Sequence, residues 1–166
     1  MSGPPARDGF ESVAVWYLAA VGGGRSPAIP IPPAGARPSM PMDVVNQQDA
    51  VPFTTVDGST IRELLAHRNS SIRKQSLAEA RLAVGCATIP HHHAVTEEIY
   101  YILSGSAEMT LGSESRPVRP GDAIAIPPGV RHTIRNTGPV ELVFLCTCAP
   151  GYEHADTFLE APAAST

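Results

Sequence analysis

Short apolar stretches alternate with turn signals along the chain from residue 43 onward. The turns contain glycine, often beside proline, and they recur about every 8 to 12 residues, which is typical of an all-β sandwich or barrel. The strands expected from this pattern are Ser76–Val84, Glu98–Leu103, Ala107–Leu111, Arg116–Val118, Ala123–Ile126, His132–Arg135 and Glu141–Cys148. No unit of fixed length repeats, which argues against solenoids and propellers.

Two segments carry the signature of a helix start. Thr60-Ile-Arg-Glu63 has the form of a capping box after an Asp57-Gly58 turn, so we expect a short helix over Ile61–His67. Ser76-Leu-Ala-Glu79 has the same form, with Gly85 as a possible stop. We expect a strand for this second segment because it leads directly into a histidine-rich stretch.

The N-terminal part of the chain differs from the rest in composition. Residues 1–41 hold 8 of the 17 prolines and 6 of the 14 glycines, a bias typical of segments that do not build a core. We therefore expect a disordered leader over residues 1–42, a β-barrel domain over residues 43–160 and a flexible tail over residues 161–166.

One apolar run, Val13–Val21, interrupts this leader. It has the length of the apolar core of a secretory signal peptide, but the residues before it carry acidic as well as basic charge. A second interpretation places the start of translation at Met40 or Met42, so that the preceding residues never pack. We favour a disordered or dispensable leader over an export signal.

Composition and charge narrow the function classes. The 166 residues include 12 Lys plus Arg and 16 Asp plus Glu, a net charge of −4, and 43% are hydrophobic. This is enough for the core of one domain, and the acidic balance argues against a nucleic-acid partner. No apolar run reaches the roughly 18 residues of a membrane span. Three cysteines are too few for a disulfide framework, which favours a cytoplasmic location.

A histidine triplet, His91–His93, carries the clearest chemical signal. In an extended strand its first and third side chains share one face, while His92 points to the other. A carboxylate follows at Glu98, and a further imidazole at His132. Three imidazoles and one carboxylate suit Fe, Mn, Ni, Cu or Zn better than Ca or Mg. On a six-coordinate metal such a site leaves two positions for water, dioxygen or a chelating substrate.

The histidines lie within two spaced motifs. The first is Gly85-x5-His91-x-His93-x4-Glu98-x6-Gly105, and the second is Gly121-x5-Pro127-x-Gly129-x2-His132-x3-Asn136. Together they resemble the two signature motifs of the cupin superfamily. All ten motif positions are present, with 15 residues between the motifs.

The resemblance implies a cupin jelly-roll barrel, also described as a double-stranded β-helix, which is often a homodimer. It implies one divalent transition metal, with Fe(II) preferred and Mn, Ni, Zn or Cu as alternatives. The implied ligands are His91, His93, Glu98 and His132; the motif spacing selects Glu98 over the adjacent Glu97. Gly105 and Asn136 are then structural positions.

Weaker hypotheses concern the residues around the metal. Tyr152 and His154 follow the last expected strand and could reach the barrel mouth as an acid/base pair, although a surface role is equally open for His154. Candidate substrate contacts are Arg62, Gln75, Glu79, Tyr100 and Cys148. Cys148 shares one strand face with Cys146, and we expect both thiols to be buried and reduced.

Three functions fit these residues. The first is an Fe(II)-dependent dioxygenase or oxygenase acting on a small organic molecule. The second is a redox-neutral metalloenzyme, such as an isomerase, lyase, decarboxylase or cyclase, or a bond-forming step in natural-product biosynthesis. The third is a non-enzymic sensor of a small molecule, but the sequence offers no DNA-binding motif. We rank them in this order, with the first two close.

Overall fold

The structure is a computed structural model, and it describes residues 42–160. Apart from Met42, the expected leader lies outside the described residues, as does the expected tail. The elements are β1 Phe53–Thr54, β2 Thr60–Leu65, β3 Ser76–Leu82, β4 His91–His93, β5 Glu97–Ser104, β6 Ala107–Leu111, β7 Glu114–Val118, β8 Ala123–Ile126, β9 His132–Asn136, β10 Leu142–Ala149, the 3-10 helix η1 His154–Asp156, and β11 Thr157–Leu159.

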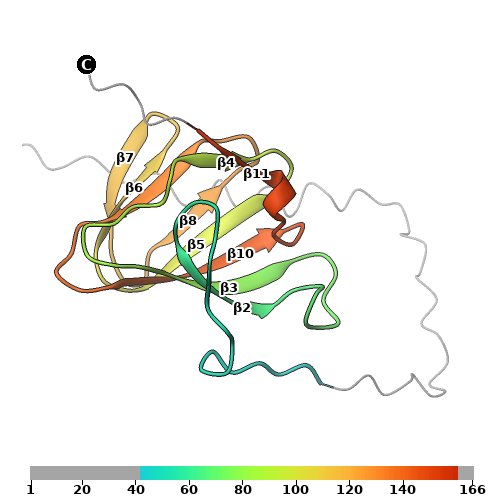
Figure 1. Ribbon diagram of the computed structural model, residues 1–166. Coiled ribbons are helices and arrows are strands. Elements are labelled where there is room, and N and C mark those ends of the chain that lie inside the picture. Colours follow the sequence, from blue (N-terminus) through green and yellow to red (C-terminus); the bar gives the residue numbers. More distant parts are fainter. Residues whose placement is uncertain (1–41, 161–166) are drawn as a thin grey trace, which may run out of the picture. The chain divides into compact units, whose positions relative to one another are not determined.

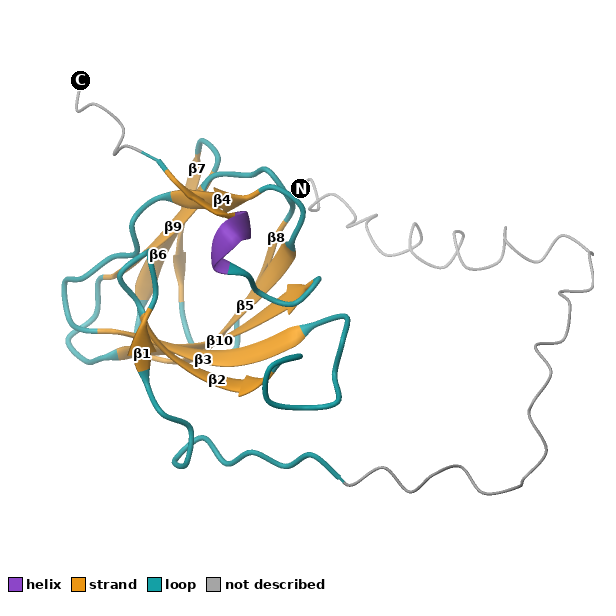
Figure 2. Cartoon of the chain, turned by 45° about the vertical axis from the view of Figure 1, so that its right-hand side comes forward, coloured by secondary structure: helices purple, strands orange, loops and turns teal. Residues whose placement is uncertain are grey.

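The strands form two antiparallel sheets that face each other (Figures 1 and 2). One sheet has the order β1-β2-β3-β10-β5-β8, and the other has the order β11-β4-β9-β6-β7. This confirms the all-β jelly-roll barrel. No helix among residues 42–160 is long and apolar enough to cross a membrane. The cytoplasmic location and the homodimer remain predictions.

The seven strands expected from the apolar pattern are all present, with ends within two residues of the expected ones. The helix over Ile61–His67 is wrong, because β2 is a strand that pairs with both β1 and β3. The capping-box interpretation fails at Glu63, whose carboxylate pairs with Arg68 instead of returning to the backbone of Thr60. Ile61 packs against the barrel core from the strand conformation.

The buried side chains fall into two groups. An apolar cluster fills the interior between the sheets, and its most deeply buried members are Ile102, Ile134, Leu142 and Phe144. The second group is polar and includes three histidines and a glutamate from the two sequence motifs. The motif residue Asn136 joins neighbouring segments, since its amide donates to the carbonyls of Leu82 and Val140 at 3.0 and 2.8 Å. Its structural role is therefore confirmed.

Candidate metal centre

Strands from both sheets bring four potential metal ligands together. His91 and His93 come from β4, Glu98 from β5 and His132 from β9. The pairing of β4 with β9 places His91 directly opposite His132, whereas Glu98 approaches from the other sheet. One ligand atom from each residue lies within 4.8 Å of the others, and all four side chains are buried. Along β5 the side chains alternate, so that Tyr100 is buried on the same face as Glu98 and Tyr101 is exposed on the other face.

Each histidine ring is oriented by a main-chain carbonyl. A carbonyl can only accept, so the Nδ1 atom carries the hydrogen and the lone pair of the neutral ring is on Nε2, the nitrogen free to bind a metal. The Nδ1-to-oxygen distances are 2.8 Å for His91 to Ile89, 3.0 Å for His132 to Val130 and 3.2 Å for His93 to Asp156.

The centre of the cluster holds buried acceptors with no donor between them. Oε2 of Glu98 lies 3.4 Å from Nε2 of His93 and 3.4 Å from Nε2 of His132. Among residues 42–160, only Oε2 of Glu98 and Nε2 of His132 are buried side-chain nitrogen or oxygen atoms that lack a hydrogen-bond partner. Such groups are costly unless a ligand satisfies them. A divalent cation bound by three imidazole nitrogens and one carboxylate oxygen fits this set.

The electrostatics favour the metal-binding forms of Glu98 and His91. Burial raises the pKa of the Glu98 carboxyl, but the neighbouring rings of His132 and His93 outweigh burial and lower its pKa to about 2. Glu98 is therefore an anion at neutral pH. Burial lowers the pKa of His91, which favours its neutral, coordinating form.

The two buried cysteines support the site without competing for the metal. The thiol of Cys148 lies 3.4 Å from Oε1 of Glu98, to which it donates a hydrogen bond. Burial raises the pKa of Cys148, and it raises that of Cys146 as well. Both therefore remain thiols, whereas a metal binds the thiolate. This agrees with the expectation of buried, reduced side chains.

Asp156 fixes the loop that connects the two ligand-bearing strands β4 and β5. Its carboxylate accepts hydrogen bonds from the backbone N–H groups of Ala94, Val95 and Thr96, at 3.0 to 3.2 Å for the closest oxygen. Its own carbonyl accepts the Nδ1 hydrogen of His93. The segment after β10 thus holds both the loop and one ligand in place.

We expect Asp156→Ala to lower the free energy of unfolding by about 1–2 kcal/mol, because three backbone N–H groups of one loop, including the partly buried one of Thr96, lose an anionic acceptor. Chemical denaturation of the metal-loaded full chain measures this loss. The control is Glu153→Ala in the same segment, which removes exposed ion pairs to Arg68 and His67 and should change stability by less than about 0.5 kcal/mol. Equal losses in the two variants would contradict the role of Asp156.

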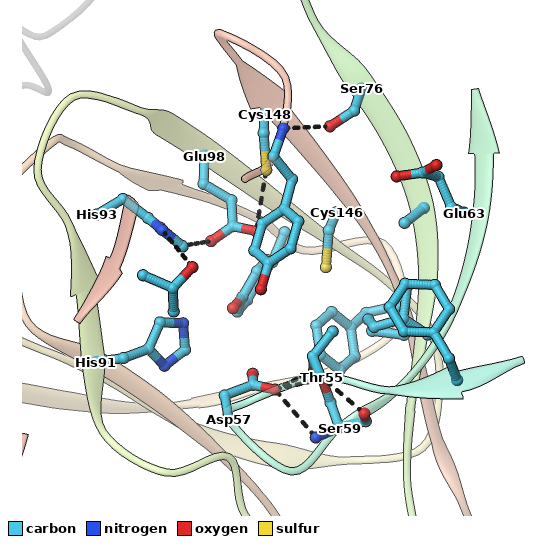
Figure 3. Close-up of a pocket in the computed structure, with 18 residues that line it drawn as sticks. Thr55, Asp57, Ser59, Glu63, Ser76, His91, His93, Glu98, Cys146 and Cys148 are labelled. Atoms are coloured by element: carbon cyan, nitrogen blue, oxygen red, sulfur yellow. Dashed lines mark hydrogen bonds and ion pairs between the residues drawn. The ribbon is translucent and has the colours of Figure 1, made fainter. Parts of the chain in front are cut away.

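A cavity with a volume of about 40 Å³ lies beside the ligands (Figure 3). This is room for a few water molecules, so a small ligand fits best. Tyr100, Cys148 and Tyr152 line it as predicted. His154 is exposed and does not line the cavity, but its Nδ1 lies 3.1 Å from the hydroxyl of Tyr152.

Three of the candidate substrate contacts, Arg62, Gln75 and Glu79, do not line this cavity. The inward residues of β3 are Ser76, Ala78 and Ala80, so Glu79 points to the outer side of the sheet. There its carboxylate pairs with Arg81 at 2.7 Å and lies 3.8 Å from Arg62. Gln75 is exposed, outside this cavity wall. Alternation showed which residues share a face but not which face is inward.

The face of His92 was predicted correctly. Its Nδ1 lies 2.6 Å from Oε1 of Glu160, outside the cluster.

The sequence interpretation missed a polar part of the cavity wall, formed by Thr55, Asp57 and Ser59. Its only signal was the Asp57-Gly58 turn, together with the even spacing of the three residues.

A jelly-roll barrel with a buried cluster of three histidines and a glutamate places the chain among small β-barrel proteins with a candidate metal site. The sequence profile of the cupin domain family matches residues 78–148. The chain is 51% identical over 106 residues to an uncharacterised protein of Methanocaldococcus jannaschii, covering 64% of this chain and 85% of that protein. The chain belongs to the cupin family.

Two further proteins are similar to it. Polyketide synthase CurC of Streptomyces cyaneus is 34% identical over 113 residues, which cover 65% of this chain and 72% of CurC. The crystal structure of a predicted oxalate decarboxylase from Thermotoga maritima superposes with a TM-score of 0.58 and 26% identity. The superposed region covers 64% of this chain and 98% of the Thermotoga maritima chain. Cupin relatives therefore include proteins named as enzymes.

Proposed function

We propose that this protein is a metal-dependent enzyme that carries out a redox-neutral reaction on a small carbonyl or carboxylate compound. One observation carries the proposal: the lone-pair-bearing atoms of Glu98 and His132 converge, buried and unpaired, beside a cavity. The proposed ligands are His91, His93, Glu98 and His132. The names of the two similar proteins, a polyketide synthase and a predicted oxalate decarboxylase, support oxygen-rich substrates.

A divalent metal at this site would polarise a carbonyl or carboxylate oxygen of the substrate as a Lewis acid. The protein contributes a shaped apolar wall, which includes Ala78, Ala80 and Phe144 and keeps bulk water away from the reacting group. Burial raises the pKa of the Tyr152 hydroxyl, which therefore stays protonated. We propose that Tyr152, hydrogen bonded to His154, donates a hydrogen bond or a proton at the cavity mouth.

The second candidate is an Fe(II)-dependent oxygenase, and the donor set favours it. His91, His93, Glu98 and His132 would hold iron through three nitrogens and one carboxylate oxygen, a donor set that suits it, and bound iron would supply dioxygen chemistry. The redox-neutral proposal ranks higher because neither name, polyketide synthase or predicted oxalate decarboxylase, denotes an oxygenase. The reaction's need for dioxygen separates the two candidates.

A redox-neutral reaction uses the metal only as a Lewis acid. We therefore expect the Zn- and Ni-loaded full chain to turn over its substrate under anaerobic conditions at rates within about tenfold of the Fe(II) form. The zinc form is diagnostic because zinc has no redox chemistry. The measurement is a screen of small oxo acids and hydroxy acids by NMR, with dioxygen uptake followed in parallel. Glu98→Gln, which removes the ligand charge while nearly keeping its shape, is the matched variant. Turnover restricted to Fe(II), with stoichiometric dioxygen uptake, would reverse the ranking.

A further inference from the structure

Asp57 forms a polar wall of the cavity together with Thr55 and Ser59. These residues belong to the turn between β1 and β2, on the side of the cavity away from Glu98 and Cys148 in Figure 3. One carboxylate oxygen, Oδ1, accepts hydrogen bonds from the hydroxyl of Thr55, from the hydroxyl of Ser59 at 2.8 Å and from the N–H of Ser59 at 3.0 Å. Three donors saturate this oxygen and fix the plane of the carboxylate.

The second oxygen of Asp57 is not used by the fold. The residue is only 8% exposed, yet Oδ2 accepts no hydrogen bond from any residue between 42 and 160. The described part of the chain places no Lys or Arg in the cavity lining. An unpaired carboxylate oxygen of a residue that lines the cavity is free to accept a hydrogen bond from a ligand.

The position of Asp57 relative to the metal cluster is fixed through the main chain. The N–H of Ile89 donates to the carbonyl of Asp57 at 2.7 Å, and the carbonyl of Ile89 accepts the Nδ1 hydrogen of His91 at 2.8 Å. The turn and one metal ligand are therefore coupled by two consecutive hydrogen bonds. A ligand that chelates the metal therefore lies in the same cavity as Asp57.

The charge of the cavity restricts which chelators can enter. Besides Glu98, the lining contains the carboxylates of Asp57 and Glu63. Glu63 is neutralised by an ion pair with Arg68 at 2.5 Å, whereas Asp57 has no cationic partner among the described residues. In a shielded cavity, an uncompensated negative charge repels a second carboxylate of a ligand and attracts a hydroxyl donor.

Resting on the proposed metal-dependent function, we propose that Asp57 is a specificity-determining residue: it accepts a hydrogen bond from a hydroxyl group of a metal-chelating oxo acid and disfavours dianionic chelators. The substrate class is thus a hydroxylated monocarboxylic oxo acid. A simple dicarboxylate such as oxalate is a poor ligand of this site.

The test uses the Ni-loaded full chain and calorimetric titration with two matched pairs of probes. Pyruvate is compared with hydroxypyruvate, and 2-oxobutanoate with 4-hydroxy-2-oxobutanoate, so that the members of a pair share charge and chelating atoms. For each pair we compare the affinity of the hydroxylated probe with that of its partner, both for the protein and for aqueous Ni²⁺. For at least one pair, this affinity ratio should be about tenfold larger for the protein than for aqueous Ni²⁺. In Asp57→Asn this preference should vanish, while oxalate affinity relative to pyruvate should rise roughly tenfold.

Two controls separate the possible failures. Asp57→Asn keeps an oxygen for the donors of Thr55 and Ser59, and elemental analysis checks that it still holds nickel. Glu141→Gln removes a carboxylate that lies outside the cavity lining and pairs with Arg81, so the hydroxyl preference and the oxalate-to-pyruvate ratio should remain unchanged. The proposal for Asp57 would be overturned if the affinity ratios of both probe pairs equalled those of aqueous Ni²⁺. It would also be overturned if Asp57→Asn left these ratios unaltered. If the nickel-loaded wild type binds none of the probes, the proposed function itself fails.

The wild-type comparison with aqueous Ni²⁺ does not depend on any variant. It therefore decides the hydroxyl preference even if Asp57→Asn fails to fold. The oxalate-to-pyruvate ratio of the wild type, set against the same ratio for aqueous Ni²⁺, tests the charge effect in the same way. A ratio at or above the aqueous one would overturn the exclusion of dianions.

Discussion

Replacing His132 with alanine is expected to remove the bound metal. His132 is fully buried, and its Nε2 is one of two unpaired buried atoms at the centre of the cluster. Residues that only orient a ligand typically contribute about 10- to 100-fold to metal affinity, so loss of a ligand itself should exceed about 100-fold. Elemental analysis of the purified full chain measures this directly.

His92→Ala is the matched control, since it removes an imidazole from the same part of the barrel. His92 belongs to β4, between two ligands, but its ring binds Glu160 on the outer side. We expect full metal occupancy in this variant. Added metal should raise the melting temperature of His92→Ala as it does for the wild type, and not that of His132→Ala. Metal loss in His92→Ala with full occupancy in His132→Ala would reverse the assignment of faces.

The ligand set could be predicted from the sequence because two kinds of information agreed. Strand alternation places His91 and His93 on one face whatever the rest of the fold. The spacing of glycines and prolines, read as a resemblance to cupins, added Glu98 and His132. Alternation alone could not show that β5 and β9, from different sheets, bring their ligands to the same point, because that convergence is a property of the closed barrel.

The errors arose where a local pattern competes with long-range pairing. The capping-box pattern at Thr60 is a statement about a few consecutive residues, whereas β2 gains backbone hydrogen bonds from β1 and β3 on its two sides. Strand pairing of this kind overrides local propensity. For the same reason the face of β3 was open, because the partners that cover Glu79 come from distant segments.

The roles of Asp57 and Asp156 depend on contacts that no local pattern encodes. Asp57 was recognised only as part of a turn, yet it lines the cavity with one oxygen unpaired. Asp156 lies in a segment without periodicity, and its partners Ala94 to Thr96 are some 60 residues away in sequence. Carboxylates that accept backbone N–H groups across such separations become visible only in the folded chain.

A glycine of the first motif gives the largest stability effect that we expect. Gly105 adopts a left-handed conformation with φ of 85°, and it follows directly after β5. A Cβ atom added there would lie 2.9 Å from the carbonyl oxygen of Glu141 and 2.9 Å from Cα of Leu142, both of them backbone atoms that cannot move aside cheaply. Leu142 begins β10, the strand that pairs with β3 and β5.

We expect Gly105→Ala to lower the free energy of unfolding by about 2–4 kcal/mol, as the sum of left-handed backbone strain and a steric clash. Gly112→Ala is the matched control, because Gly112 is also left-handed, with φ of 59°, but an added Cβ meets nothing within 4 Å. It should lose only about 1 kcal/mol, the strain alone. Urea denaturation of both variants at saturating metal isolates the clash as the difference between them. Equal losses would show that the approach of Gly105 to β10 does not constrain this corner of the barrel.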